Sequence, residues 1–160
     1  MGAVDEAVWD FLFGVTNGVA VTAWIVLAFL PRGPIMRALV LYAGVGILCL
    51  IYAGMAVAVA GGWVDPDAIV PERPTDLFDY TVDGLRWFFM SDAGIVVGWT
   101  HYLAFDLFVG AWIAGDADHK GIGSIWQVPI LVLTFLSGPI GLLLWLIVRE
   151  PAARRSGRPQ

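Results

Sequence analysis

The sequence predicts an all-α membrane protein: four transmembrane helices in an antiparallel bundle, with a long acidic, partly interfacial loop between the second and third helices. Of the 160 residues, 59% are hydrophobic and only 14% are charged, whereas about a quarter of a soluble domain is charged. Four apolar runs reach the ~20 residues that a helix needs to cross a bilayer. We place them at residues 8–30, 35–61, 95–114 and 125–148, in one domain of residues 1–150 followed by a basic tail, 151–160.

The first two spans are separated only by a tight turn, residues 31–34. Pro31 ends one helix and Pro34 opens the next, because proline lacks the N–H that a helix interior requires but fits the first turn. The two spans are therefore expected to pack against each other as a hairpin.

The connection between the second and third spans, residues 62–92, contains seven acidic residues and two arginines. Long connections usually have structure or function of their own. Residues 76–90 combine acidic and aromatic side chains, as in an amphipathic helix at the membrane surface. Two interpretations stay open: a solvated loop with an aromatic anchor, or a lid over a lipid-soluble ligand.

The third span carries two ionisable residues, His101 and Asp106, at membrane depth. A carboxylate there costs roughly 2.5–3.5 kcal/mol on insertion scales, so it needs a partner or a purpose. Helical geometry puts the two β-carbons about 10 Å apart, too far for a direct hydrogen bond. Each residue should therefore avoid lipid and meet a group on another helix, with Asn17 the leading candidate for Asp106. Ser91 or Asp92 can cap the start of this span.

These residues allow chemistry or a structural role. Asp106 could act as general acid and His101 as general base, or both could be interhelical hydrogen-bonding groups. No metal is expected, because two ligands at membrane depth are fewer than the three or four that a site needs. No cofactor is expected either: His119 and Lys120, which haem or a retinal Schiff base would require, are in a polar turn. We expect no nucleic-acid partner, and the oligomeric state stays open.

Pro139 should kink the fourth span, because it removes a backbone donor from the helix interior. An even number of straight crossings would put both termini on one side of the membrane. That side would carry six of the nine basic residues. Since basic residues are enriched in cytoplasmic segments, we expect cytoplasmic termini.

A long motif in the third span resembles a known family. The similarity extends to Asn17, Trp24 and Pro31 in the first span, to Pro129, Thr134 and Pro139 in the fourth, and to Arg149. The motif reads Gly98-Trp99-x-His101-Tyr102-Leu103-Ala104-Phe105-Asp106-Leu107-Phe108-Val109-Gly110-x-Trp112-Ile113. It is similar to the signature of the neoxanthin-synthase-related (abscisic-acid-deficient-four-like) membrane proteins. Residue 111 departs from the pattern, being Ala where relatives are expected to carry arginine.

The resemblance implies a membrane protein linked to carotenoid (xanthophyll) metabolism. Plant relatives are needed to convert the epoxy-carotenoid violaxanthin into the allenic neoxanthin, an isomerisation without a redox cofactor. By analogy, His101 and Asp106 are the catalytic candidates. The substrate-binding candidates are Asn17, Trp24, Trp99, Tyr102, Phe105, Phe108, Trp112 and Thr134. The alternative is a non-catalytic protein that binds a carotenoid or membrane lipid, or a small subunit of a membrane complex.

Overall fold

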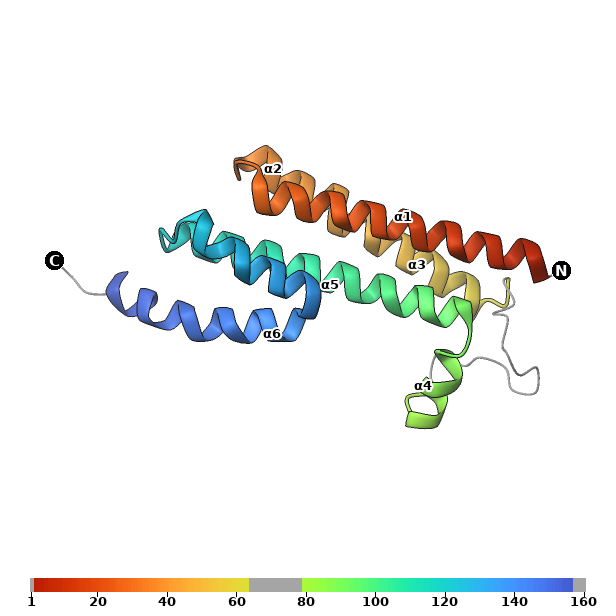
Figure 1. Ribbon diagram of the computed structural model, residues 1–160. Helices are drawn as coiled ribbons and strands as arrows, with labels where there is room; N and C mark the ends of the chain where they lie inside the picture. The colour runs from red at the N-terminus through yellow and green to blue at the C-terminus, as the bar shows by residue number, and fades with distance from the viewer. Residues whose placement is uncertain (1, 64–78, 157–160) are drawn as a thin grey trace. The chain divides into compact units, whose positions relative to one another are not determined.

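The computed structural model describes residues 2–63 and 79–156, and the regular elements in these ranges are helices. They are drawn in Figure 1 and run, in order, as α1 Gly2–Phe29, α2 Pro34–Ala38, a π-helical segment Leu39–Gly46, α3 Ile47–Ala60, α4 Val82–Phe88, α5 Asp92–His119 and α6 Ser124–Ser156.

Four helical stretches are long and apolar enough to cross a membrane, as predicted: Ala7–Phe29, Pro34–Ala60, Asp92–His119 and Ser124–Glu150. The stretch formed by α5 is the most buried of the four. In its most apolar window 56% of the residues are buried, against 28%, 22% and 33% in the others. A helix that carries polar residues at membrane depth can hide them only in this way.

The second stretch is not the uniform α-helix that the sequence suggested, because its middle, Leu39–Gly46, is π-helical. Gly44 is buried in this segment. A β-carbon there would stand 2.9 Å from the Ala23 β-carbon and 3.0 Å from Leu107 Cδ2. The absence of a side chain therefore allows the backbone to approach α1 and α5 closely, as small residues do between helices in lipid.

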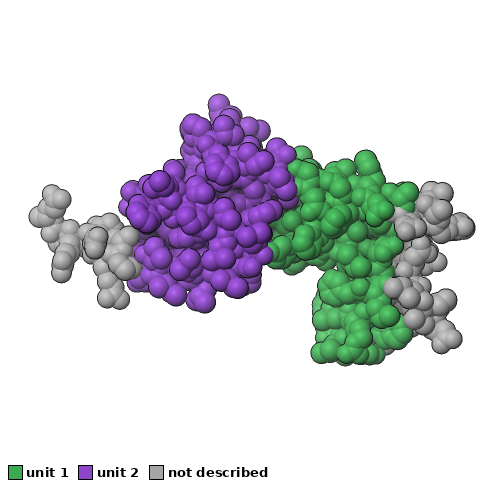
Figure 2. Space-filling view, viewed as in Figure 1, with its two compact units in different colours: residues 1–19, 46–103 green, residues 20–45, 104–160 purple. Residues whose placement is uncertain are grey.

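The chain divides into two compact units (Figure 2). Unit 1 comprises residues 1–19 and 46–103, and so contains α3, α4 and the first parts of α1 and α5. Unit 2 comprises residues 20–45 and 104–160, and contains α2, α6 and the remainder of α1 and α5.

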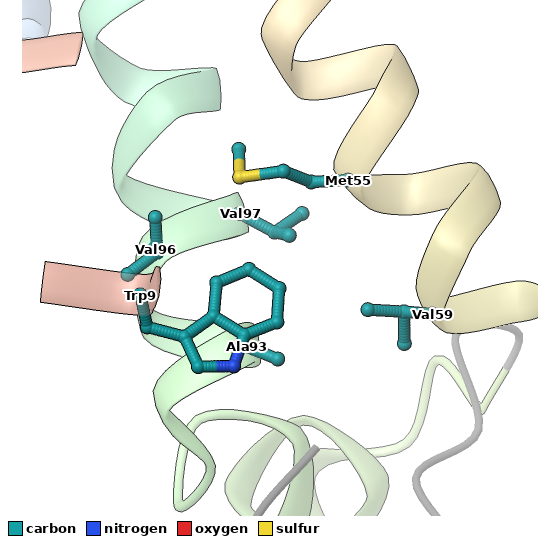
Figure 3. Packing of buried hydrophobic residues seen from close by; sticks show 6 residues of the cluster. All are labelled: Trp9, Met55, Val59, Ala93, Val96 and Val97. Carbon is teal, nitrogen blue, oxygen red and sulfur yellow. The ribbon is translucent and has the colours of Figure 1, made fainter. Parts of the chain in front are cut away.

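The core of unit 1 joins α1, α3 and α5 (Figure 3). Trp9 is only 3% exposed and Ala93 is completely buried. The cluster consists of Trp9, Met55, Val59, Ala93, Val96 and Val97. Because lipid is as apolar as these side chains, the stabilisation comes mainly from close packing and dispersion.

Helix α4 lies within the predicted amphipathic stretch 76–90; residues 76–78 of that stretch lie outside the described residues. The Thr81 hydroxyl caps it by accepting a hydrogen bond from Gly84 N–H at 3.0 Å. At its other end the Ser91 hydroxyl accepts from Gly94 N–H at 3.0 Å and donates to the Phe88 carbonyl at 2.8 Å. The expected cap at Ser91 is thus confirmed, and it also ties α4 to the start of α5.

Helix α6 is broken and folds back on itself. Ser137 has non-helical backbone angles, φ −157° and ψ 65°, two residues before Pro139. Gln127 Nε2 donates to Asp118 Oδ1 at 3.1 Å, and Trp145 Nε1 donates to Asp116 Oδ2 at 3.1 Å. In a straight helix residues 127 and 145 would be about 27 Å apart, so both cannot reach the same turn of α5. Figure 1 shows α6 returning in this way.

The fold-back changes the expectation for the fourth span. The kink that Pro139 predicts is present, but the chain reverses its direction there instead of continuing as one straight crossing over residues 125–148. The first half, residues 124–136, is shorter than the ~20 residues needed to span. The expectation that both termini lie on one side of the membrane depended on an even number of straight crossings. The reversal of α6 removes the basis for that expectation.

Candidate functional site

The site residues predicted from the sequence are divided between the two units. His101, Asn17, Trp99 and Tyr102 belong to unit 1. The others belong to unit 2: Asp106, Trp24, Phe105, Phe108, Trp112 and Thr134. Direct cooperation of His101 with Asp106 stays a prediction.

His101 lines a cavity of about 250 Å³ in unit 1. The imidazole packs against the Tyr52 ring, with 5.5 Å between the ring centroids. The expectation that His101 is buried is wrong: its side chain is exposed, toward the cavity. The cavity is lined by Tyr52, Asp79, Tyr80, Leu85, Phe88, Phe89, Val97, Gly98 and His101. It therefore combines apolar walls with a few polar groups, as small-molecule sites do.

Helix α4 and the residues beside it form one wall of this cavity. The Phe89 ring lies on Gly98, where a β-carbon would stand 3.0 Å from Phe89 Cζ. Asp79 is fixed by the Thr81 backbone N–H, which donates to its Oδ1 at 3.1 Å, and by the Thr81 hydroxyl at 2.7 Å. A carboxylate and an imidazole thus line one cavity, the arrangement that acid–base chemistry requires.

Asn17 holds a neighbouring set of aromatic side chains in unit 1. Its Oδ1 accepts a hydrogen bond from the Trp99 indole at 3.1 Å, and its Nδ2 donates to the Phe13 carbonyl at 2.7 Å. The Trp99 ring centroid lies 6.0 Å from that of Phe13 and 5.4 Å from that of Tyr102. Asn17 therefore orients Trp99, and its expected hydrogen bond with Asp106 stays a prediction.

Asp106 lies at the tip of the α6 hairpin in unit 2. It is 9% exposed, which confirms the expected burial. Its carboxyl group packs on Gly138, where a β-carbon would stand 2.5 Å from Asp106 Cγ. The helix break leaves backbone groups of α6 without their usual intrahelical partners, and such backbone is tolerated at membrane depth only where protein surrounds it. The carboxyl group thus lies next to the break in α6.

Two other candidates in unit 2 are packed into the protein. Thr134 is completely buried, and its hydroxyl donates to the Ile130 carbonyl at 2.8 Å. Trp24 is 6% exposed and meets Phe135 edge-on, with 5.6 Å between ring centroids. Both rings also line an apolar pocket of about 170 Å³. Thr134 therefore serves packing in this structure, whereas Trp24 keeps one face on a small pocket.

Three aromatic substrate-binding candidates of α5 in unit 2 are largely exposed. Phe105 is 57% exposed, Phe108 50% and Trp112 41%. The physical reason is that no hydrophobic driving force pulls such rings inward when the surrounding medium is itself apolar. Phe108 and Trp112 also line a groove of about 250 Å³ in unit 2.

A polar network at the end of α5 was missed by sequence reasoning. Asp118 accepts from Arg32 at 3.0 Å and from Arg37 at 3.1 Å. Asp116 faces Lys120 at 2.5 Å and Arg149 at 3.0 Å. Arg32 also donates to Gln127, which is completely buried. The available clue was the grouping of charged residues at the ends of the spans, but partners more than eighty positions apart cannot be paired from spacing.

Over residues 2–63 and 79–156 the structure contains no group of three or more His, Cys, Asp or Glu side chains that could hold a metal ion.

The comparisons with known proteins agree with the motif in α5. A family model described as ABA4-like (ABA DEFICIENT 4-like) matches residues 11–145, which include every predicted site residue. No curated protein and no solved structure matches the chain. Since the matched region covers most of the sequence, the chain belongs to the ABA4-like family of membrane proteins.

Proposed function

We propose that the protein binds a carotenoid and isomerises an epoxide-bearing end group of it. The observation that carries this proposal is the family match over residues 11–145, a range that includes His101 and Asp106. Isomerisation conserves atoms and electrons, so it requires a proton donor and a proton acceptor and no redox partner.

The cavity beside α4 is the best candidate for the reacting end group. Its volume, about 250 Å³, is below the ~300–1,000 Å³ of sites that enclose a whole drug-sized ligand. It would therefore take one ring of the ligand and leave the polyene in the surrounding lipid. The walls supplied by Phe88, Phe89 and Leu85 suit such an apolar ring.

In the proposed reaction His101 is the base. An acid gives its proton to the epoxide oxygen as one C–O bond breaks, and His101 removes the proton from a neighbouring polyene carbon. The electron pair of that C–H bond forms the new double bond. Sequence reasoning assigns the acid to Asp106; Asp79, which lines the same cavity as His101, is the alternative that the geometry offers.

A non-catalytic carotenoid- or lipid-binding protein is the second candidate. The exposure of Phe105, Phe108 and Trp112 favours it, because a polyene lying along these rings would be bound without reaching a closed site. A role as a small subunit of a membrane complex would use the same exposed rings.

We also infer a membrane topology for this function: an antiparallel bundle of three crossings, α1, Pro34–Ala60 and α5, with α6 as a re-entrant hairpin. Antiparallel packing is supported by the contacts of Gly44 with Ala23 and Leu107. With α6 returning, seven of the nine basic residues lie on the side of the α1–α2 turn and the C-terminus. By the positive-inside rule this side is cytoplasmic, and the N-terminal side and the acidic loop 62–92 are on the opposite side.

The test is expression in a membrane that contains epoxy-carotenoids, followed by chromatography of bound pigment and of product. The unmutated chain should form an isomer with the same mass as the substrate. His101→Gln should retain bound pigment, while product formation falls by about 10²-fold or more, the contribution of a placed proton-transfer group. Bound pigment without product in the unmutated chain would support the binder, and neither pigment nor product would remove the carotenoid link.

A further inference from the structure

A groove in unit 2 combines apolar walls with cationic side chains at one end. Its volume is about 250 Å³, and it is formed by α1, α2, the π-helical segment and α5. The apolar walls include Leu27, Val40, Leu41, Phe108 and Trp112. The cationic residues are Arg32 and Arg37.

The two arginines of the groove differ in their surroundings. The Arg32 side chain is only 9% exposed, and it donates to Asp118 at 3.0 Å and to the Leu27 carbonyl at 2.9 Å. The Arg37 side chain is 48% exposed and shares the Asp118 carboxylate at 3.1 Å. One carboxylate therefore balances two guanidinium groups, and the unbalanced positive charge is on the accessible Arg37.

The neighbouring charges increase this excess. Asp116 faces two cations, Lys120 at 2.5 Å and Arg149 at 3.0 Å. The Arg149 guanidinium also lies over the ring of Trp112, a wall of the groove, at 5.1 Å from the centroid. Four cations accompany two carboxylates in this network, and the exposed Glu150 reduces the excess without cancelling it.

The groove is placed to receive a lipid from the bilayer. Its cationic end lies where apolar helices finish, because α1 ends at Phe29, α2 begins at Pro34 and α5 ends at His119. Its walls extend toward Leu41 and Phe108, farther from these ends. Phe108 is 50% exposed, so an acyl chain can reach the wall directly from the membrane.

We propose that this groove binds one anionic phospholipid, with its phosphate at Arg37 and an acyl chain against Leu41, Phe108 and Trp112. Basic pockets at the ends of transmembrane helices bind acidic headgroups in this manner. A zwitterionic lipid carries its own cation, which the local positive excess disfavours. The proposal does not depend on the carotenoid function.

The experiment counts lipids that remain on the protein. The full chain is reconstituted in vesicles of phosphatidylglycerol and phosphatidylcholine in equal parts, extracted in mild detergent, and weighed by native mass spectrometry. We expect one retained phosphatidylglycerol. Arg37→Gln should lower the retained fraction about fivefold, the effect of one cation near a membrane surface. Arg86→Gln is the matched control, because Arg86 is 67% exposed and pairs with Asp83 on α4, outside the groove.

Two more variants keep the test decisive if Arg37→Gln fails to fold. Arg37→Lys preserves the charge and should retain the lipid. Ala111→Trp fills the groove at a lining residue without changing the charge, and it should lose the lipid. Equal retention of phosphatidylcholine, or equal losses in Arg37→Gln and Arg86→Gln, would overturn the proposal. So would displacement of the lipid by inorganic phosphate together with full retention in Ala111→Trp, since that result indicates an anion site without an acyl-chain groove.

Discussion

His101 and Asp106 are five positions apart on α5 but have opposite surroundings. His101 is exposed and lines a cavity whose wall is the short helix α4. Asp106 is buried, and its carboxyl group packs on Gly138 at the break of α6. An ionisable group at membrane depth is costly, and here one residue lines an accessible cavity while the other is enclosed beside the break in α6. A group that lines a cavity can be reached by a ligand, whereas the Asp106 carboxyl is enclosed by the protein.

If α6 crossed the membrane as one straight helix, Asp106 would not lie at a helix break, and the contrast with His101 would fail. Side-specific cysteine labelling distinguishes a straight α6 from a reversed one with an all-or-none result. Cys49 is the only cysteine, so Cys49→Ser supplies the background. We expect Gly33→Cys, Gly123→Cys and Ser156→Cys to react from one side of the membrane and Trp63→Cys from the other. The reason is that the start of α6 and its second half both contact the end of α5, at Asp118 and Asp116 respectively. Ser156→Cys reacting together with Trp63→Cys would show a straight crossing.

The next largest effect distinguishes the two carboxyl groups, Asp79 and Asp106, that could act as the acid opposite the base His101. Asp79→Asn should reduce product formation by about 10²-fold if the acid is in the cavity, while Asp106→Asn changes it little. The measurement is product per folded protein, with bound pigment as the internal control. A loss of product formation in Asp106→Asn alone would instead assign the acid to Asp106, and would support the pair of His101 and Asp106 that the motif suggests.

Sequence reasoning succeeded where a local rule determines the result. Run length and composition located the membrane stretches, proline chemistry located the break near Pro139, and hydroxyl capping located the start of α5 at Ser91. It failed where the result depends on tertiary contacts. A proline predicts a kink, but the full reversal also requires Gly138 and Gly141 to leave room for other side chains and backbone.

The direction in which a helix face points was also beyond the sequence. The spacing of Phe105, Phe108 and Trp112 on α5 indicates that they share a side of the helix. It cannot say whether that side faces a neighbour or lipid, since both media are apolar. The ion pairs of Asp116 and Asp118 were missed for a different reason, because their arginine partners are distant in sequence.

Packing at the hairpin tip should be far less tolerant than packing beside the cavity. A β-carbon at Gly141 would stand 2.5 Å from Thr134 Cα, which is backbone and cannot move aside. At Gly98 the obstacle is the ring of Phe89, which is 49% exposed and can rotate. Gly141→Ala should therefore lower the free energy of unfolding by about 1–3 kcal/mol, and Gly98→Ala by much less.

Thermal or denaturant unfolding in one detergent provides this measurement. Gly14→Ala is the control, because nothing lies within 4 Å of a β-carbon there. An equal loss in Gly98→Ala and Gly141→Ala would mean that the tip is no more tightly packed than the wall of the cavity.

The smallest expected effect concerns ion pairs in the two units. Asp118 of unit 2 is 27% exposed and pairs with Arg37 and with Arg32, which is only 9% exposed. Asp83 of unit 1 is 58% exposed and pairs with Arg86 at 3.4 Å. Exposed pairs contribute about 0.2–1 kcal/mol and are screened by salt. Asp83→Asn should therefore change the unfolding free energy by less than about 0.5 kcal/mol, and less again at high salt. Asp118→Asn should cost about 1–2 kcal/mol, because it leaves a nearly buried guanidinium with neutral acceptors only. Salt screens the exposed Asp83–Arg86 pair but not the pairs of Asp118. The difference in unfolding free energy between the two variants should therefore widen as salt is added. If both losses disappear in high salt, the network at the end of α5 is solvated and does not hold α6 in its reversed path.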